Sequence, residues 1–190
     1  MDGFVGGATA DEQEVRGAPN KAIHDLLYAF YWYKKVAEPN ARLLHVGSSS
    51  GVEAYGGLMK TLAADLGIAD DVHFLGPVSQ GALNSLYETS QLFLCMSEHE
   101  GFGIPLIEAM AKDCPVLAYD AAAVADTMGG AGVLFKNKVF DEVALMAKRM
   151  VHDSALREQI LQGQRERISR YKNRDLGTEL REHLAPLLDG

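Results

Sequence analysis

Short, continuously apolar segments alternate with segments of helical periodicity through most of this chain, and this alternation restricts the fold more than any other feature. The apolar segments predict strands at residues 3–6, 43–46, 72–75, 92–96, 116–119 and 133–135. Between them, apolar residues recur at the spacing of core-facing helices, as in residues 23–31 and 55–66. Apolar strands separated by helices indicate a parallel sheet covered on both faces. We therefore predict a doubly wound, Rossmann-like α/β domain with a helical C-terminal tail that begins near Phe140.

Charge and cysteine content exclude several kinds of function. The formal net charge of −8 argues against a nucleic-acid partner, because nucleic-acid binding depends on Lys and Arg that neutralise phosphates. Cys95 and Cys114 lack metal-ligand spacing, which favours reduced, structural thiols in a cytoplasmic protein. No apolar run approaches the length of a membrane span, and no signal segment opens the chain. We expect a cytoplasmic protein with at most peripheral contact at the inner face of the membrane.

The segment SEHEGFGIPLIE, residues 97–108, contains the most informative chemistry. It follows a predicted buried strand and opens a predicted helix at residues 103–111, which is apolar almost all round and therefore expected to be buried. Gly101 and Gly103 let a ligand approach the backbone closely. The free N–H groups of the first helical turn suit a diphosphate. Glu100 and Glu108 suit neutral hydroxyls, which predicts a sugar on one side of the diphosphate and a ribose on the other.

Other functions fit this segment less well. Paired carboxylates also serve as the acid and nucleophile of glycosidases, but a glycosidase has no need of a glycine-rich turn between a strand and a helix. The turn has neither the Gly-x-Gly-x-x-Gly pattern of dinucleotide-binding proteins nor the lysine loop of ATPases. For an arbitrary glutamate, a local role on a helix surface is the better interpretation. Glu108 lies on an otherwise apolar helix, which favours a functional role.

The stretch EGFGIPLIEAM, residues 100–110, resembles the E-x7-E motif of retaining glycosyltransferases of family 4 (glycosyltransferase group 1), which have the GT-B fold. The resemblance extends in order through PNK at residues 19–21, ARLLHVGSSS at 41–50, VHFLGPV at 72–78, PVLAY at 115–119 and GGAGVLF at 129–135. The sequence of these segments most resembles that of bacterial polysaccharide and lipopolysaccharide mannosyltransferases. This resemblance implies that residues 1–190 are the donor-binding, C-terminal half of a GT-B fold, and that the N-terminal acceptor domain is absent from this chain.

The resemblance also implies a role for each site residue. Glu100, the candidate catalytic residue, would contact hydroxyls of the transferred sugar, and Glu108 would bind the ribose. Lys21 would neutralise the diphosphate. Arg16 would lie beside Lys21, and the backbone around Val78 would contact the nucleotide base. The remaining donor-binding positions, whose amides would hold the sugar and the diphosphate, are Gly101, Phe102, Gly103 and Ile104. Family members work without a metal, so neither a metal nor any other cofactor is expected.

The expected reaction of the full-length protein is transfer of a sugar, with retention, from a nucleoside-diphosphate sugar to a glycan or lipid-linked acceptor. The acceptor would bind through the missing N-terminal domain, so this domain alone is expected to be inactive. GDP-mannose is the first donor to consider. Two alternatives stay open, a non-catalytic module that senses sugar nucleotides and a UDP-sugar epimerase.

The sequence departs from the family pattern in two places. Residues 7–16 insert an acidic stretch between Gly6 and the PNK segment, which we interpret as a solvated loop. Ala125-Asp126 stands where relatives usually have Pro-Glu, which leaves the role of Asp126 in donor contact open. The basic residues of the C-terminal segment are expected to form a solvated helix face; they are Arg165, Arg167, Arg170, Lys172 and Arg174.

Overall fold

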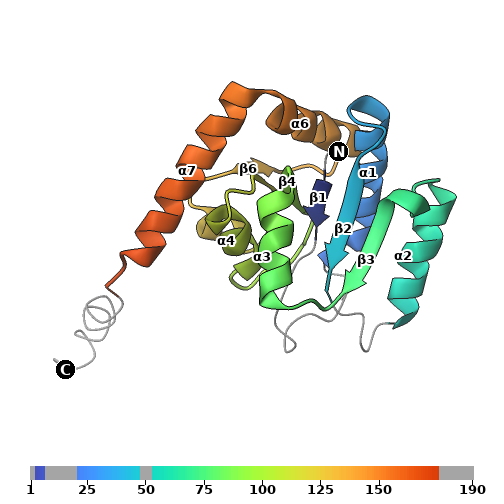
Figure 1. Cartoon of the computed structure of the whole chain (residues 1–190), viewed down its shortest axis with the longest axis horizontal. Helices are drawn as coiled ribbons and strands as arrows, with labels where there is room; N and C mark the ends of the chain where they lie inside the picture. Colours follow the sequence, from blue (N-terminus) through green and yellow to red (C-terminus); the bar gives the residue numbers. More distant parts are fainter. Residues whose placement is uncertain (1–2, 7–20, 48–52, 176–190) are drawn as a thin grey trace.

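The computed structural model describes residues 3–6, 21–47 and 53–175 of this chain (Figure 1). The described residues form a six-stranded sheet in which every neighbouring pair of strands is parallel. The strands are β1 (Gly3–Gly6), β2 (Arg42–Val46), β3 (Val72–Gly76), β4 (Leu92–Cys95), β5 (Val116–Tyr119) and β6 (Val133–Phe135). All six predicted strands are thus confirmed, with bounds that shift by at most one residue.

The helices connect successive strands and cover both faces of the sheet. They are α1 (Ile23–Val36), α2 (Glu53–Asp65), a short 3-10 helix (Ala69–Asp71), α3 (Gln80–Thr89), α4 (Ile104–Ala111), α5 (Val124–Met128), α6 (Phe140–His152) and α7 (Ser154–Lys172). The sequence analysis did not predict α5. It also treated the chain from Phe140 onward as one helical region, whereas the helix breaks at Asp153, whose carboxylate accepts a hydrogen bond from the N–H of Leu156 at 3.0 Å and so caps α7.

Alternation of side chains along the central strands produces two hydrophobic cores. Leu92 and Leu94 of β4 point into the core beneath α1 and α6, whereas Phe93 and Cys95 point into the core beneath α4 and α5. This burial on both faces explains why the strand sequence is apolar throughout. Helix α7 contacts both α4 and α6 and closes the edge of the sheet near β6 (Figure 1).

The strand order is β3-β2-β1-β4-β5-β6, which confirms the doubly wound prediction. The order of winding reverses between β1 and β4, and ligands of open parallel sheets bind at the carboxyl ends of the strands beside such a reversal. The loop that follows β4 is therefore placed where this architecture forms its sites. The insert at residues 7–16 and the segment from residue 176 onward lie outside the described residues.

Both cysteines are free and buried. Burial raises the pKa of the Cys95 thiol to about 11 and that of Cys114 to about 12. Since the thiolate is the reactive form, neither side chain is activated as a nucleophile, which agrees with the predicted structural role. None of the described helices is long and apolar enough to cross a membrane.

Candidate functional site at the carboxyl edge of the sheet

The loop between β4 and α4, residues 96–103, turns sharply at Gly103. This glycine has φ +72° and is the N-cap of α4, where no side chain caps the first turn. A Cβ atom at Gly103 would lie 2.8 Å from Leu106 Cδ1, so both backbone conformation and packing require glycine. Pro105 has no N–H group that needs a cap, and the Leu106 N–H donates to the Gly103 carbonyl at 3.0 Å.

Short contacts hold the backbone of this loop against α5. The Thr127 hydroxyl donates to the Phe102 carbonyl, and the Ala123 N–H donates to the Glu100 carbonyl at 3.4 Å. The Ser97 hydroxyl donates to the His99 carbonyl at 3.1 Å. Helix α5, which sequence reasoning missed, therefore supports the loop that carries Glu100.

Lys21 and Glu100 are brought into direct contact. The Lys21 ammonium donates to Glu100 Oε1 at 2.8 Å, and the side chains are only 22% and 11% exposed. Lys21 lies just before α1, so the pair joins the start of α1 to the loop after β4. In the described structure the cation predicted for the diphosphate thus neutralises the carboxylate predicted for the sugar.

A second cation fixes the loop from its other side. Lys138 Nζ contacts Asp25 Oδ2 at 2.6 Å and Glu98 Oε1 at 2.9 Å, and it lies 4.6 Å from the centre of the Tyr119 ring. Burial lowers the pKa of Lys138, but its hydrogen bonds to the two carboxylates raise it by more, so the pKa lies above its usual value. Lys138 therefore joins α1, the loop after β4 and the end of β5 through one charged centre.

Glu108 is only partly satisfied. Gln80 Nε2, from the first turn of α3, donates to Glu108 Oε1 at 3.1 Å. Oε2 is buried without a hydrogen-bond partner among the described residues, and so is the hydroxyl of Tyr87. The Tyr87 hydroxyl is close enough to lower the pKa of Glu108 but does not form a hydrogen bond of normal geometry; burial has the larger effect and raises that pKa. Oε2 therefore faces the Tyr87 hydroxyl in the interior, whereas the Gln80–Oε1 contact is exposed and is the part of Glu108 that a ligand hydroxyl can reach.

The remaining predicted positions lie around these groups, with one correction. Val78 is half-buried just before α3, on the side of the site where Gln80 meets Glu108. Gly101, Phe102 and Ile104 are exposed, the latter two by 52% and 51%. The prediction that the 103–111 helix is buried nearly all round is wrong, because Leu106, Ala109 and Met110 are the buried residues of α4, whereas Ile104 at its start is exposed. Arg16 lies outside the described residues.

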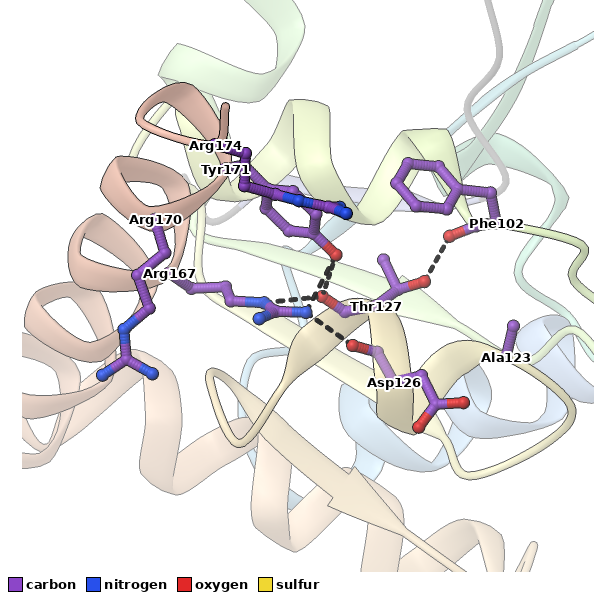
Figure 2. Close-up of a pocket in the computed structure, with 8 residues that line it drawn as sticks. All are labelled: Phe102, Ala123, Asp126, Thr127, Arg167, Arg170, Tyr171 and Arg174. Carbon is purple, nitrogen blue, oxygen red and sulfur yellow. Dashed lines mark hydrogen bonds between the residues drawn. The ribbon is translucent and has the colours of Figure 1, made fainter. Parts of the chain in front are cut away.

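A hollow of about 330 Å³ adjoins the same loop on the far side of Phe102 (Figure 2). Arginines of α7 line it, which corrects the prediction of a uniformly solvated basic face. Arg165 fits that prediction, since it pairs with Glu158 and Asp113 at 2.9 and 2.8 Å. Arg167 does not: it donates to the carbonyls of Thr127 and Asp126 at 3.1 and 2.6 Å. The side chain of Asp126 lines the hollow, and its backbone carbonyl accepts the hydrogen bond from Arg167 of α7.

Within the described residues, no group of three or more His, Cys, Asp or Glu side chains could hold a metal ion. The buried His45 has its pKa lowered to about 4 by burial and lies beside the Phe74 ring. It therefore belongs to the packing of the sheet and stays neutral at physiological pH.

Residues 15–167 match the family described as glycosyl transferases group 1, and the chain belongs to this family. The match spans strands β2 to β6, the loop after β4 and most of α7. It therefore includes every predicted site position, from Arg16 to Glu108.

Curated relatives match part of the chain. A D-inositol 3-phosphate glycosyltransferase of Gordonia bronchialis is 44% identical over 97 residues, which are 49% of this chain and 21% of the relative. An O-antigen chain mannosyltransferase of Salmonella typhimurium is 34% identical over 119 residues, or 63% of this chain and 31% of the relative. The chain thus spans less than a third of the length of either relative.

Solved structures share the fold over nearly the whole chain. A sucrose-phosphate synthase from Thermosynechococcus elongatus superimposes with a TM-score of 0.78 at 22% identity, covering 97% of this chain and 46% of that one. The Anabaena protein HepE, in complex with UDP and glucose, superimposes with a TM-score of 0.74 at 21% identity, covering 99% of this chain and 48% of that one. These neighbours confirm the GT-B-like α/β architecture.

Proposed function

We propose that this domain binds the nucleoside diphosphate sugar from which the full-length glycosyltransferase transfers a hexose, with retention at the anomeric carbon. One observation carries the proposal: the exposed Gln80–Glu108 contact and the Lys21–Glu100 pair lie on α4 and just before it, with no side-chain cap between them, beside the reversal point of the sheet. Such an edge offers separate places for a ribose, a diphosphate and a sugar.

The proposed roles follow from this arrangement. Glu108 accepts hydrogen bonds from the ribose through Oε1, the oxygen at the exposed contact with Gln80. The amides of residues 101–104 and the Lys21 ammonium receive the diphosphate, with Arg16 beside Lys21. Glu100 orients the sugar, and Val78 lies beside the nucleotide base. When donor binds, Lys21 contacts both Glu100 and the diphosphate, so a fixed cation provides the charge neutralisation and no metal is required.

The acceptor belongs to another part of the enzyme in this proposal. The proposed donor-binding residues that the structure describes lie on one edge of one domain, and the GT-B fold places its reaction between two such domains. We propose that a glycan or lipid-linked acceptor binds through an N-terminal domain outside this chain, and that this domain alone is inactive. The reaction would take place in the cytoplasm, at most in peripheral contact with the membrane. The relative named as an inositol 3-phosphate glycosyltransferase supports glycosyl transfer, and the one named as an O-antigen chain mannosyltransferase supports a hexose as the transferred sugar.

Substitutions of Glu100 and Glu108 should affect the affinities for the two ligands differently. Glu108→Gln should weaken binding of both nucleoside diphosphate and nucleotide-sugar by about 10- to 150-fold, the effect of about 1.5–3 kcal/mol for one lost charge-assisted hydrogen bond. Glu100→Gln should weaken only the nucleotide-sugar, because it frees Lys21 for the diphosphate. Titration calorimetry with both ligands and both variants measures the four affinities. Equal loss of both ligands in Glu100→Gln would show that Glu100 does not hold the sugar.

The stability of Glu108→Gln provides a second measurement. Burial raises the pKa of Glu108, so its charge destabilises the fold progressively as the pH rises above the usual value of 4.5. The amide lacks this cost, and the variant should unfold at the same or a higher temperature at pH 7 while binding less nucleotide. Glu88→Gln removes an exposed carboxylate paired with Lys112 and is the matched control, with unchanged affinity.

A further inference from the structure

The hollow beside Phe102 has the size and chemistry of a ligand site and is not used by the proposed donor. Its volume of about 330 Å³ is at the lower end of the range for small-molecule pockets. Phe102 and Thr127 line one side, and Arg167, Arg170, Tyr171 and Arg174 of the last turns of α7 and the residues after it line the other (Figure 2).

The charge of the hollow is opposite to that of the chain. Three guanidinium groups line it, although the formal net charge of the protein is −8. The lining includes one carboxylate, that of Asp126, and Figure 2 shows it directed away from the Arg167 guanidinium. The field in the hollow therefore favours an anion.

Arg167 is fixed in place but not neutralised. Its Nε and Nη2 donate to the carbonyls of Thr127 and Asp126, and Nη2 also contacts the Tyr171 hydroxyl at 2.9 Å. The guanidinium carbon lies 4.4 Å from the centre of the Tyr171 ring, and it would lie 2.4 Å from a Cβ atom at Gly129. Among the described residues no carboxylate pairs with this side chain. A preorganised guanidinium loses little entropy when it binds a ligand.

The arginines of α7 differ according to where they lie. Arg165, outside the hollow, is neutralised by two carboxylates. Arg170, which lines the hollow, has no ion-pair or hydrogen-bond partner in the part of the chain that the structure describes, and its side chain is exposed. Cations in the last turn of a helix stabilise its negative end, but this effect does not explain why Arg165 pairs with two carboxylates whereas Arg167 and Arg170 pair with none among the described residues.

The position of the hollow indicates its use. Phe102 is two residues from Glu100, and its half-exposed ring meets the Tyr171 ring edge-on at 6.1 Å. A ligand in the hollow would therefore lie next to the proposed sugar position. We propose that the hollow binds the phosphate group of a phosphate-bearing acceptor, through the guanidinium groups of Arg170, Arg174 and Arg167. The acceptor role depends on the proposed function; the binding of phosphate does not.

The test uses the 190-residue chain and two phosphate sources. The probes are glucose 1-phosphate, with glucose as its uncharged control, and vesicles of phosphatidylglycerol, with phosphatidylcholine vesicles as theirs. Arg170→Gln/Arg174→Gln removes two cations at exposed positions of the hollow. Arg149→Gln/Arg165→Gln removes two exposed cations elsewhere and keeps the net charge matched. Lys21→Met removes the cation of the donor site. Thermal unfolding checks that each variant is folded.

We expect glucose 1-phosphate to bind, and the hollow variant to weaken it at least tenfold, as loss of charge-assisted hydrogen bonds to a phosphate predicts, with little change in the other two variants. Binding to phosphatidylglycerol vesicles alone, lost in the same variant, would identify a lipid headgroup as the source of the phosphate. The proposal is wrong if neither phosphate probe binds, if both charge-matched variants lose binding equally, or if only Lys21→Met does. UDP binding, measured in parallel, tests the donor proposal separately.

Discussion

Replacing Lys138 with methionine should lower the free energy of unfolding by about 3 kcal/mol, the lower end of the range for removing one partner of a buried ion pair. Asp25 is 12% exposed in its side chain, and Lys138 is its closest cation at 2.6 Å. Without Lys138 a nearly buried carboxylate keeps, among the described residues, only His24 as an ion-pair partner, at 3.3 Å. Urea unfolding at pH 7 measures the loss.

Two further variants identify the cause. Glu98→Gln breaks the other contact of Lys138, but Glu98 is 59% exposed and its loss should change stability by less than about 1 kcal/mol. Asp25→Asn combined with Lys138→Met should recover part of the loss, because no charge is left buried. The pKa of Lys138 is raised, so its contribution should be present below the usual value of 10.5 and disappear as the pH rises through the raised value. Equal effects of Lys138→Met and Glu98→Gln would contradict this explanation.

Replacing Gln164 with methionine should lower the free energy of unfolding by about 2–6 kcal/mol, since two buried backbone groups lose their partner at about 1–3 kcal/mol each. Gln164 is fully buried on α7. Its Oε1 accepts from the Val116 N–H, and its Nε2 donates to the Cys114 carbonyl, both at 2.9 Å. Its side chain thus continues the hydrogen bonding of β5 and attaches α7 to the sheet.

Gln162→Met on the exposed face of the same helix is the control, and it should change the free energy of unfolding by less than about 0.5 kcal/mol. Methionine is unbranched and similar in length to glutamine, so cavity formation is a minor part of the effect. If denaturant unfolding gives the same midpoint for Gln164→Met and Gln162→Met, the two buried hydrogen bonds do not hold α7 in place.

Strands were more predictable than short helices because burial on both faces leaves a local signature. Phe93 and Leu94 belong to different cores, so every residue of β4 is apolar and the run is recognisable. Helix α5 has only five residues, too few for a 3.6-residue period to appear. The break at Asp153 was readable in principle from its capping side chain, but the helical pattern continues on both sides of it.

The site residues on one continuous segment were predicted, and their partners were not. Glu100 and Glu108 follow from the composition of the loop, and Lys21 from its resemblance to a family motif. The direct Lys21–Glu100 contact joins positions 79 residues apart, and Lys138 reaches Asp25 across 113 residues. No local pattern encodes such pairs. Arg167, which donates to carbonyls of α5, could not be distinguished in sequence from Arg165, which pairs with Asp113 after α4. These partners come from elements far from α7 in the sequence.

Titration calorimetry of the 190-residue chain with UDP, GDP and ADP, each beside its nucleoside, tests the central claim most directly. The account predicts that at least one nucleoside diphosphate binds, that its nucleoside binds much more weakly, and that Lys21→Met and Glu108→Gln each weaken the diphosphate at least tenfold. Absence of binding by all three diphosphates and their sugar derivatives, or binding that neither substitution changes, would contradict a donor site at this edge of the sheet.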